Sequence, residues 1–484
     1  MSNNVPAVQL PRVLGARDVV LLYTIAIVSL QWLSTAAQMG PASLLLWLLA
    51  LVVFFVPSGL AVMELSSRYD GEGGLYLWVK HSFGDKHGFV AGWSYVVSNL
   101  VFFPTLLLFI AGTLSQVFGA AWPGLKDSVP FNATVSLLVL WGVVGVNVVG
   151  MKNAKRLTNG CALLMGVVLM GLVAAALVST YRHGSASTFA GHLLPDIDDP
   201  ALVKSFATMM FALVGLELAP LMGSEIREPR RVIPRAILVA GALIIVFYML
   251  GTAALLMALP KSRIESIVGI ADAVIAIAEG LGVPVVGKIL ALLMALESVG
   301  VLAAWVAGSA RLPYVVGIDQ HLPAALGRLH PRWRTPHVAL LASGTITSCL
   351  VLLALAGPSV GDAYQILVDM TVVLTFIPIA YLFVALPVLR AKGGSDGLRI
   401  LYVPGGRAGV AVVSGLGLLS TLVAIGCALV PPAAADAAIF YAKVLGGCAA
   451  FLGIGWALSL TNATRKGRGE GAPEIAEHLA DERV

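Results

Sequence analysis

Long apolar runs separated by short polar segments make up most of the chain of 484 residues. Twelve of these runs are long enough for a helix that crosses a bilayer, which needs ~20 residues. A shorter apolar run, 264–280, carries three carboxylates, so we predict an external interfacial helix there rather than a span. The pattern predicts an all-α membrane protein. Its twelve transmembrane helices are predicted over 18–38, 43–66, 88–118, 131–150, 157–181, 203–223, 234–258, 286–312, 337–356, 363–389, 408–430 and 437–460.

Two of the predicted spans are interrupted near their middle. The first contains Ser29-Leu30-Gln31, and the sixth contains Gly215-Leu216-Glu217. A charged side chain at the centre of a membrane helix costs ~2.5–3.5 kcal/mol on insertion scales, so Glu217 indicates a functional site. Transporters break helices near the midplane, where unpaired backbone groups bind a polar substrate. The two interruptions therefore predict a substrate site between helices 1 and 6.

Interrupted spans at corresponding places in two halves of a chain are typical of an inverted repeat with the binding site between the halves. We therefore predict two repeats of five helices and two additional helices. The predicted organisation is a cytoplasmic N-terminal segment 1–17, a first inverted repeat 18–181, a second inverted repeat 203–389, two further helices within 408–460 and a cytoplasmic tail 461–484.

The basic residues predict the orientation of these spans. Every predicted loop on the side of the N-terminus contains at least two Lys or Arg, whereas the loops on the opposite side contain few. Cytoplasmic loops of membrane proteins carry this excess of positive charge, so both termini are predicted to be cytoplasmic. Residues 1–17 are polar and include Arg12 and Arg17, which indicates that no cleavable signal peptide is present.

The composition argues against several other classes of protein. Charged residues are 12% of the chain and the mean hydropathy is +0.91, whereas soluble domains carry ~25% charge. The orientation explains the net charge of +5 better than nucleic acid binding does. The histidines show no metal-ligand spacing, and the GxxxxGK match at 282–288 lacks the Ser or Thr of a phosphate-binding loop. We expect no metal, no cofactor and no ATP-driven pump.

The four cysteines all lie within apolar runs, and their spacing suggests neither a disulfide framework nor a zinc site. We interpret them as buried packing residues. They are Cys161, Cys349, Cys427 and Cys448.

Three segments on the predicted cytoplasmic side resemble those of a known family. They are the stretch FFVPSGLAVMELSSRYDGEGGLYLWVKHSFGDKHGFVAGW at 54–93, the FA-x-x-G-x-E and E-x-P-R-R-x-I-P-R-A patterns within 206–236, and GSARLPYVVGIDQHLPAALGRLHPRWRTP at 308–336. With the span pattern, they resemble the amino acid–polyamine–organocation superfamily, and in particular bacterial glutamate/γ-aminobutyrate antiporter-like permeases. The resemblance implies a LeuT-like fold with a five-plus-five inverted repeat, two extra helices, and broken helices 1 and 6.

The resemblance also implies which residues bind the substrate. The substrate carboxylate is expected to meet backbone amides at the break in helix 1, and the amino group is expected to meet carbonyls at the break in helix 6. Phe211 is expected to close over the substrate as an aromatic gate, and Glu217 to sense protons at the inner end of the site. Trp305 is a further gating candidate on span eight. The expected substrate-binding residues are Val28, Ser29, Leu30, Gln31, Asn99, Phe211, Ala212, Val214 and Gly215.

Several of these residues have a structural alternative. Glu217 is alternatively an anchor to a neighbouring helix, Asn99 a bridge between two helices, and Trp305 a packing residue. Glu297 and Asp369 are further intramembrane carboxylates, which face either a water-filled vestibule or a structural hydrogen-bond network. The break in helix 1 lacks the glycine found in many relatives. Span five lacks the buried lysine of some proton-coupled relatives, which argues mildly against that route of coupling.

The sequence thus predicts a secondary active amino acid transporter of the bacterial cytoplasmic membrane that works by alternating access. Exchange of an amino acid for a related amine or amino acid is favoured. The alternatives are proton-coupled amino acid symport and, in a different class, an amino acid sensor that does not transport. An enzyme is not expected, since no nucleophile–base pair is evident. The expected partners are an amino acid or amine substrate and the lipid bilayer; the sequence leaves the substrate and the oligomeric state open.

Overall fold

The computed structural model describes residues 10–69, 71–119, 121–122, 124–189, 194–195, 200–260, 269–318, 321–357, 359–393, 400–431 and 436–467. Helices make up most of this part of the chain. In order they are α1 Ala16–Ile27, α2 Gln31–Ala37, α3 Ala42–Ala50, the π-helix η1 Leu51–Phe55, α4 Val56–Arg68, α5 Leu75–Phe83, α6 Asp85–Phe118, α7 Val129–Val149, α8 Met151–His183, α9 Pro200–Ala212, α10 Leu218–Leu221, α11 Pro229–Ala258, α12 Gly269–Gly280, α13 Pro284–Ser309, α14 Arg311–Ile318, α15 His337–Leu355, α16 Val360–Lys392, α17 Gly406–Ala428 and α18 Ala437–Gly467.

The described helices confirm the predicted all-α membrane fold. Ten helical segments are long and apolar enough to cross a membrane, and α1 with α2 forms an eleventh that is bent by 47°. The predicted sixth span corresponds to α9 and α10, which are separated by the break over 213–217. Both spans that were predicted to be interrupted are therefore broken helices. The bounds of the two repeats remain predictions.

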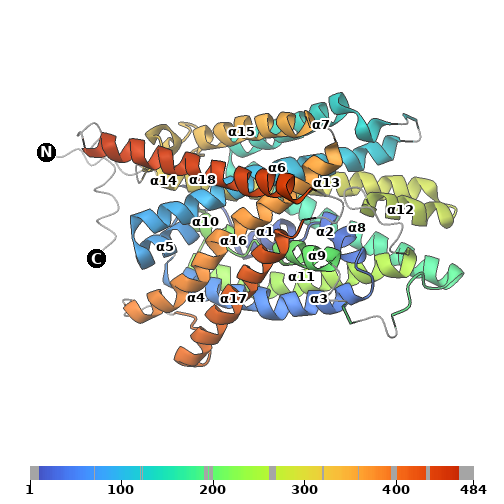
Figure 1. The fold of residues 1–484 in the computed structure, drawn as a ribbon, viewed down its shortest axis with the longest axis horizontal. Coiled ribbons are helices and arrows are strands. Elements are labelled where there is room, and N and C mark those ends of the chain that lie inside the picture. Colours follow the sequence, from blue (N-terminus) through green and yellow to red (C-terminus); the bar gives the residue numbers. More distant parts are fainter. Residues whose placement is uncertain are drawn as a thin grey trace.

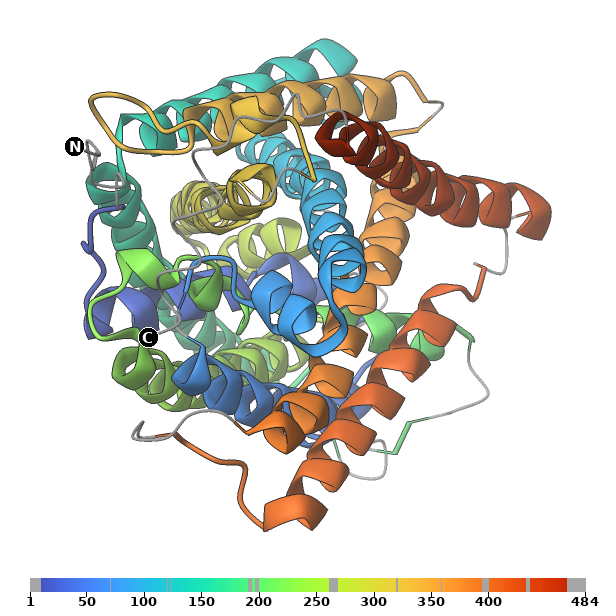
Figure 2. The ribbon, with the colours of Figure 1, turned by 90° about the vertical axis from the view of Figure 1, so that its left-hand side faces the viewer.

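The broken helices lie inside the bundle. Figure 1 shows α1, α2 and α9 in the middle, with α7 and α15 along one edge and α3 and α17 towards the other. In the end-on view of Figure 2, α18 lies at the periphery beside the outer layer that α7 and α15 form. The apolar segment of α6 is 100% buried, whereas that of α18 is only 17% buried. The core is thus built around α6 and the broken helices, and the outer helices present apolar faces to the lipid.

Some features of the fold differ from the sequence prediction. The short helices α5 and α14 lie in segments where no helix was predicted. The predicted interfacial helix is present as α12, which buries Ile270, Val274 and Ile277, although its expected first residues fall outside the described part. Cys349 is exposed, so its interpretation as a buried packing residue is wrong. An apolar run in a membrane protein faces either the core or the lipid, and hydropathy alone does not distinguish the two.

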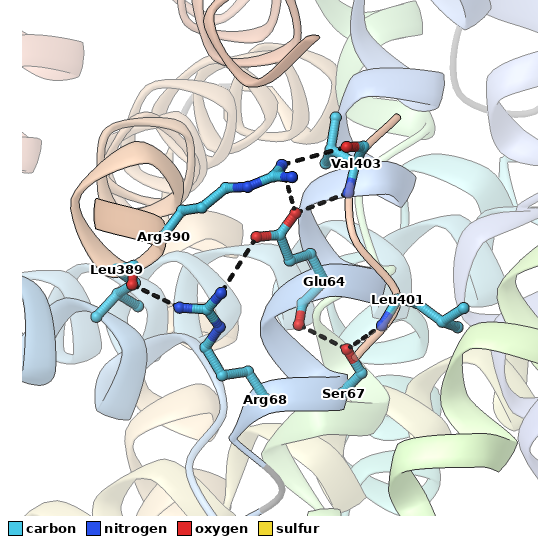
Figure 3. A network of polar contacts seen from close by, with 7 residues as sticks. All are labelled: Glu64, Ser67, Arg68, Leu389, Arg390, Leu401 and Val403. Atoms are coloured by element: carbon cyan, nitrogen blue, oxygen red, sulfur yellow. Dashed lines mark hydrogen bonds and ion pairs between the residues drawn. The ribbon is translucent and has the colours of Figure 1, made fainter. Parts of the chain in front are cut away.

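A buried carboxylate holds together the end of the bundle that is predicted to be cytoplasmic. Glu64 of α4 accepts hydrogen bonds from Arg390 of α16 at 3.1 Å and from the backbone N–H of Val403 at 2.7 Å. Its other oxygen lies 3.7 Å from the guanidinium of Arg68. Arg68 in turn donates to the carbonyl of Leu389 at 2.6 Å. Figure 3 shows that this network ties α4 to α16 and to the segment before α17.

The chain before α1 is joined to the segment after α10 at a second point. Leu14 and Ile226 form an isolated parallel bridge. Beside this bridge, Arg311 donates to both carboxylate oxygens of Glu225 at 2.8 and 3.1 Å, and both side chains are buried. The bidentate pair satisfies two charges that would otherwise be costly to bury. It links the segment after α10 to α14.

Glu72, in the loop between α4 and α5, faces this ion pair. It accepts hydrogen bonds from the backbone N–H of Ser224 at 3.0 Å and from the Ser224 hydroxyl. Burial, and to a lesser extent the negative charge of Glu225, raises the pKa of Glu72 to about 8. Glu72 is therefore mostly neutral near neutral pH, which limits its repulsion of Glu225.

Replacing Glu64 should destabilise the protein. Glu64→Ala leaves the guanidinium groups of Arg68 and Arg390 without their buried counter-charge, and breaking such a pair costs about 3–5 kcal/mol. We expect a lower melting temperature in detergent. Glu228→Ala is the control, because Glu228 pairs with Arg231 on the surface, where an ion pair contributes little. Equal melting temperatures for both variants would contradict a stabilising role of the Glu64 network.

Candidate functional site

One hydroxyl group connects the two helix breaks. The hydroxyl oxygen of Tyr248 of α11 lies 2.7 Å from the carbonyl oxygen of Ile27 and 3.0 Å from that of Ala212, and its single proton can be donated to either of them. Its oxygen also lies 3.4 Å from the backbone nitrogen of Ser29, which donates to it. The ring stacks on Trp47 with centroids 4.2 Å apart, and this contact fixes the direction of the hydroxyl. Tyr248 therefore places the end of α1 and the end of α9 beside each other.

The first break is made without glycine. Val28 has an extended backbone with φ −74° and ψ 111°, which ends α1, and α2 begins at Gln31. The indole N–H of Trp305 donates to the carbonyl oxygen of Ala26 at 2.8 Å. Helix ends leave backbone groups unpaired, and here Tyr248 and Trp305 satisfy carbonyl groups at the end of α1. Side chains from other helices thus stabilise a break that the local sequence does not require.

The second break depends on a glycine and a carboxylate. Gly215 has φ +136°, a conformation that residues with a side chain rarely adopt. Its backbone N–H donates to Glu217 at 3.2 Å, and the hydroxyl of Tyr95 donates to the other oxygen of Glu217 at 3.0 Å. The carbonyl of Phe211 accepts the N–H of Val214 at 2.9 Å. Glu217 thus stabilises the break directly as well as linking it to α6.

A small pocket lies beside the two breaks. Three aromatic rings form one side of it: Phe102 makes edge contacts with Phe211 and Trp305 at centroid distances of 5.7 and 5.9 Å. Phe211 also meets Trp32 of α2 edge-on at 5.6 Å. The lining residues are Tyr95, Ser98, Asn99, Phe102, Phe211, Trp305, Thr371 and Thr375. Aromatic rings and hydroxyl groups together suit a ligand that is polar at one end and apolar at the other.

Several buried polar atoms around the breaks have no hydrogen-bond partner within the described part of the chain. They include the hydroxyls of Ser29 and Tyr23, both polar atoms of the Gln31 amide and the Oδ1 atom of Asn99. The amide nitrogen of Asn99 donates to the Tyr95 carbonyl at 2.8 Å. A buried polar group without a partner is costly. These atoms are consistent with a site that binds a polar molecule or water.

The structure brings most of the predicted site residues together. The breaks contain Val28, Ser29, Leu30, Ala212, Val214 and Gly215, and Gln31 opens α2. Asn99, Phe211 and Trp305 line the pocket, and Glu217 lies next to the break in α9. Asp369 lies elsewhere, in an ion pair with Lys204 of α9 at 2.7 Å.

Sequence reasoning missed six contributors to the site, namely Tyr95, Ser98, Phe102, Tyr248, Thr371 and Thr375. Tyr248 was not singled out, because one tyrosine in an apolar span carries no pattern. Thr371 and Thr375 are one helical turn apart on α16 and so share a face. Tyr95 lies one turn from Asn99 on α6, and the sequence Tyr95–Phe102 has polar or aromatic residues at helical spacing. This face of α6 could therefore have been identified from the sequence as part of the site.

Comparison with known proteins identifies the family. The family model described as amino acid permease matches residues 14–449. The chain belongs to the amino acid permease family. This permease is a multi-pass secondary amino acid transporter, and its fold and relatives are those of transporters rather than enzymes.

Its relatives include proteins that are named as antiporters. An uncharacterized transporter of Legionella pneumophila is 26% identical over 451 residues, which cover 92% of the permease and 96% of that protein. The probable agmatine/putrescine antiporter AguD of Lactococcus lactis is 23% identical, with 76% and 79% covered. A glutamate/gamma-aminobutyrate antiporter of the same species is 23% identical, with 80% and 77% covered. The crystal structure of MhsT in complex with L-phenylalanine has the same fold, with a TM-score of 0.58, 18% identity and 85% and 98% covered.

A side chain at position 215 should abolish transport by this permease. A Cβ atom there would lie 2.7 Å from Cγ1 of Ile27 and 3.4 Å from Cζ2 of Trp305, and the positive φ adds strain. We therefore expect Gly215→Ala to lose uptake in proteoliposomes. Gly145→Ala in α7 is the control, because no atom lies within 4 Å of its Cβ position. Parental uptake by Gly215→Ala would show that the break does not form part of the transport site.

Removing the Tyr248 hydroxyl should loosen both breaks while keeping the ring. Tyr248→Phe removes the one proton that either the Ile27 or the Ala212 carbonyl can accept, at a cost of about 1–3 kcal/mol for an unsatisfied group. We expect a lower melting temperature and weaker substrate binding, measured by thermal shift and by radioligand binding. The control is Tyr364→Phe, since Tyr364 is a buried tyrosine that makes no hydrogen bond within the described residues. If both variants have the same melting temperature and the same substrate affinity, the hydroxyl of Tyr248 does not hold the two breaks together.

Proposed function

We propose that this permease exchanges an amino acid for a related amine or amino acid across the bacterial cytoplasmic membrane, with both termini inside. The relatives that support exchange are the two Lactococcus antiporters. The observation that carries the proposal is the pairing of two helix breaks through Tyr248 next to a pocket with unpaired polar atoms.

The geometry suggests how such a substrate would bind. Leu30 and Gln31 begin α2, so their backbone N–H groups precede the first helical hydrogen bonds and can donate to a carboxylate. Carbonyls at the end of α9 retain a second lone pair even where one bond is made, and so can accept from an ammonium group. In this arrangement the backbone recognises the α-carboxylate and α-amine that all amino acids share. The side chain of the substrate would then extend towards Asn99, Thr371 and Thr375.

Phe211 is positioned to cover a substrate in this pocket. It is the residue of α9 just before the break, and its ring contacts Trp32 and Phe102. A small rotation of α9 would move the ring while the contacts of Tyr248 hold the backbone below it. We propose that Phe211 is the aromatic gate and that Trp305, which is hydrogen-bonded to Ala26, is the fixed wall behind the substrate.

Proton-coupled uptake and sensing without transport are the competing functions. A symporter accumulates substrate into empty vesicles when a proton gradient is imposed. A sensor binds substrate but gives no flux. An exchanger requires a substrate on the opposite side of the membrane.

The decisive measurement is counterflow in proteoliposomes. Vesicles loaded with unlabelled L-glutamate, γ-aminobutyrate, agmatine or putrescine, or with a wider panel of amino acids, are diluted into each labelled compound. Exchange predicts rapid uptake of label only in vesicles that contain a matching internal substrate. Binding without any flux would favour a sensor, and uptake into empty vesicles that follows an imposed proton gradient would favour symport. Gly215→Ala vesicles provide the transport-dead background.

A further inference from the structure

Glu297 is a buried carboxylate to which the site described above assigns no role. It lies at the middle of α13, eight residues before Trp305, and its exposed fraction is 0%. At 1.5 Å per residue, the two side chains start about 12 Å apart along the helix. Glu297 is therefore separate from the pocket, although it lies on the same helix.

Most of the other buried carboxylates of the described residues have partners that stabilise their charge; Glu72, in the loop between α4 and α5, resembles Glu297 in having an oxygen without a partner. Glu64, Glu225 and Asp369 form ion pairs with arginine or lysine. Glu217 accepts one N–H and one O–H hydrogen bond, one at each oxygen. Glu297 differs from these four carboxylates, because it has no ion pair in the described part of the chain and its Oε2 atom has no hydrogen-bond partner there. A carboxylate buried without such partners is strongly disfavoured in its charged form.

The contacts of Ser298 indicate where a proton lies. The Ser298 hydroxyl oxygen is 2.9 Å from the Met294 carbonyl oxygen and 3.0 Å from Oε1 of Glu297. A serine hydroxyl carries one proton, so it can donate to only one of these two acceptors. If Glu297 is protonated, both contacts become hydrogen bonds: Ser298 donates to Met294, and Glu297 donates to Ser298. The geometry thus matches a neutral carboxyl group.

The surroundings of Glu297 connect it to the substrate site. The Cys161 thiol of α8 donates to the carbonyl of Leu296, the residue before Glu297, at 3.4 Å. One turn later on α13, a Cβ atom on Gly300 would meet both Cys161 and Ile25 of α1. The same helix holds the end of α1 through Trp305 and Ala26. A change at Glu297 would therefore reach the first break through the packing of α13 against α1.

The other charged groups on the helices that pack against α13 are either paired with another residue or lie near a helix end or on the surface. Asp18 of α1 pairs with Lys155 of α8 at 2.9 Å, and Arg311 of α14 pairs with Glu225. On α12, Asp272 lies in the first turn and Glu279 is exposed. The charged residues described on α6 and the remaining ones on α8 are near the ends of those helices.

We propose that Glu297 is a proton-binding site of this permease, and that its protonation is coupled through α13 to the break between α1 and α2. The step is a simple dissociation: the carboxyl O–H bond breaks, the proton passes to water when the site is open, and the carboxylate remains. The proton site can be tested without a substrate, whereas its coupling to transport rests on the proposed function. It differs from the predicted role of Glu217, which accepts a hydrogen bond from another residue at each of its two oxygens.

Infrared spectroscopy of the purified protein tests the proton site directly. A buried protonated carboxyl group gives a carbonyl stretching band that a carboxylate lacks. We expect such absorption at neutral pH in the parent protein, with one contribution from Glu297 and another from Glu72. Glu297→Gln should remove one contribution and leave the other, whereas Glu217→Gln and the matched surface control Glu279→Gln should keep both. Absence of the absorption in the parent, or a parental spectrum in Glu297→Gln, would overturn the proposal.

Two further variants guard against a folding defect in Glu297→Gln. Glu297→Asp keeps a carboxyl group in a shifted position, and Ser298→Ala removes its hydrogen-bond partner. Each should shift the Glu297 contribution rather than remove it, and an unshifted contribution in both would place the proton elsewhere. The spectra need no substrate, so they remain decisive even if no compound is exchanged and the proposed function fails.

A flux measurement then tests the coupling. For a compound that shows counterflow among L-glutamate, γ-aminobutyrate, agmatine and putrescine, the pH dependence of exchange should be flatter in Glu297→Gln than in the parent and in Glu279→Gln. An unchanged pH profile in Glu297→Gln would overturn the coupling between Glu297 and transport.

Discussion

Unpaired backbone groups in a water-poor interior are the constraint on which the rest of this structure depends. Two helices are interrupted inside the bundle, and each interruption frees N–H and C=O groups that water cannot readily satisfy. Tyr248 and Trp305 satisfy carbonyls at the end of α1, and Glu217 satisfies the N–H of Gly215. Tyr248 and Trp305 belong to α11 and α13, which lie outside the broken pairs, and Glu217 is linked to α6 through Tyr95. The packing of α11 and α13 against α1 is therefore necessary for the breaks to exist.

The same constraint explains how charge is distributed. Glu64 and Glu225 are buried at one end of the bundle, where each is paired with arginine and connects segments that are distant in sequence. Asp369 is paired with Lys204. These three carboxylates thus serve as fixed connections between helices, whereas Glu217 supports a break and Glu297 has no cation in the described part of the chain. Glu217 and Glu297 therefore differ in their contacts, although both are carboxylates within a predicted span.

The sequence predicted the large features of the fold well. The spans, the interruption at Ser29–Gln31 and the interruption at Gly215–Glu217 all correspond to observed elements, because hydropathy follows bilayer thickness and polar residues within a span are costly. Helix ends were less well predicted. For example, α8 extends over Met151–His183 rather than 157–181, since a helix continues through polar residues beyond the apolar segment. Cys349 was misplaced because lipid-facing and core-facing apolar residues look alike in sequence.

The sequence by itself determined the membrane class, the order of the apolar helices, the position of both breaks and, through family motifs, the residues at their centre. Only the tertiary structure decided which side chains complete those breaks and which carboxylates are paired. Tyr248 lies 219 residues from Ser29 along the chain, and the partner of Asp369 lies 165 residues away. Such pairings arise from which helix faces meet, and hydropathy records only that a face is apolar. The lack of a cation at Glu297 likewise became visible only when every neighbouring helix was in place.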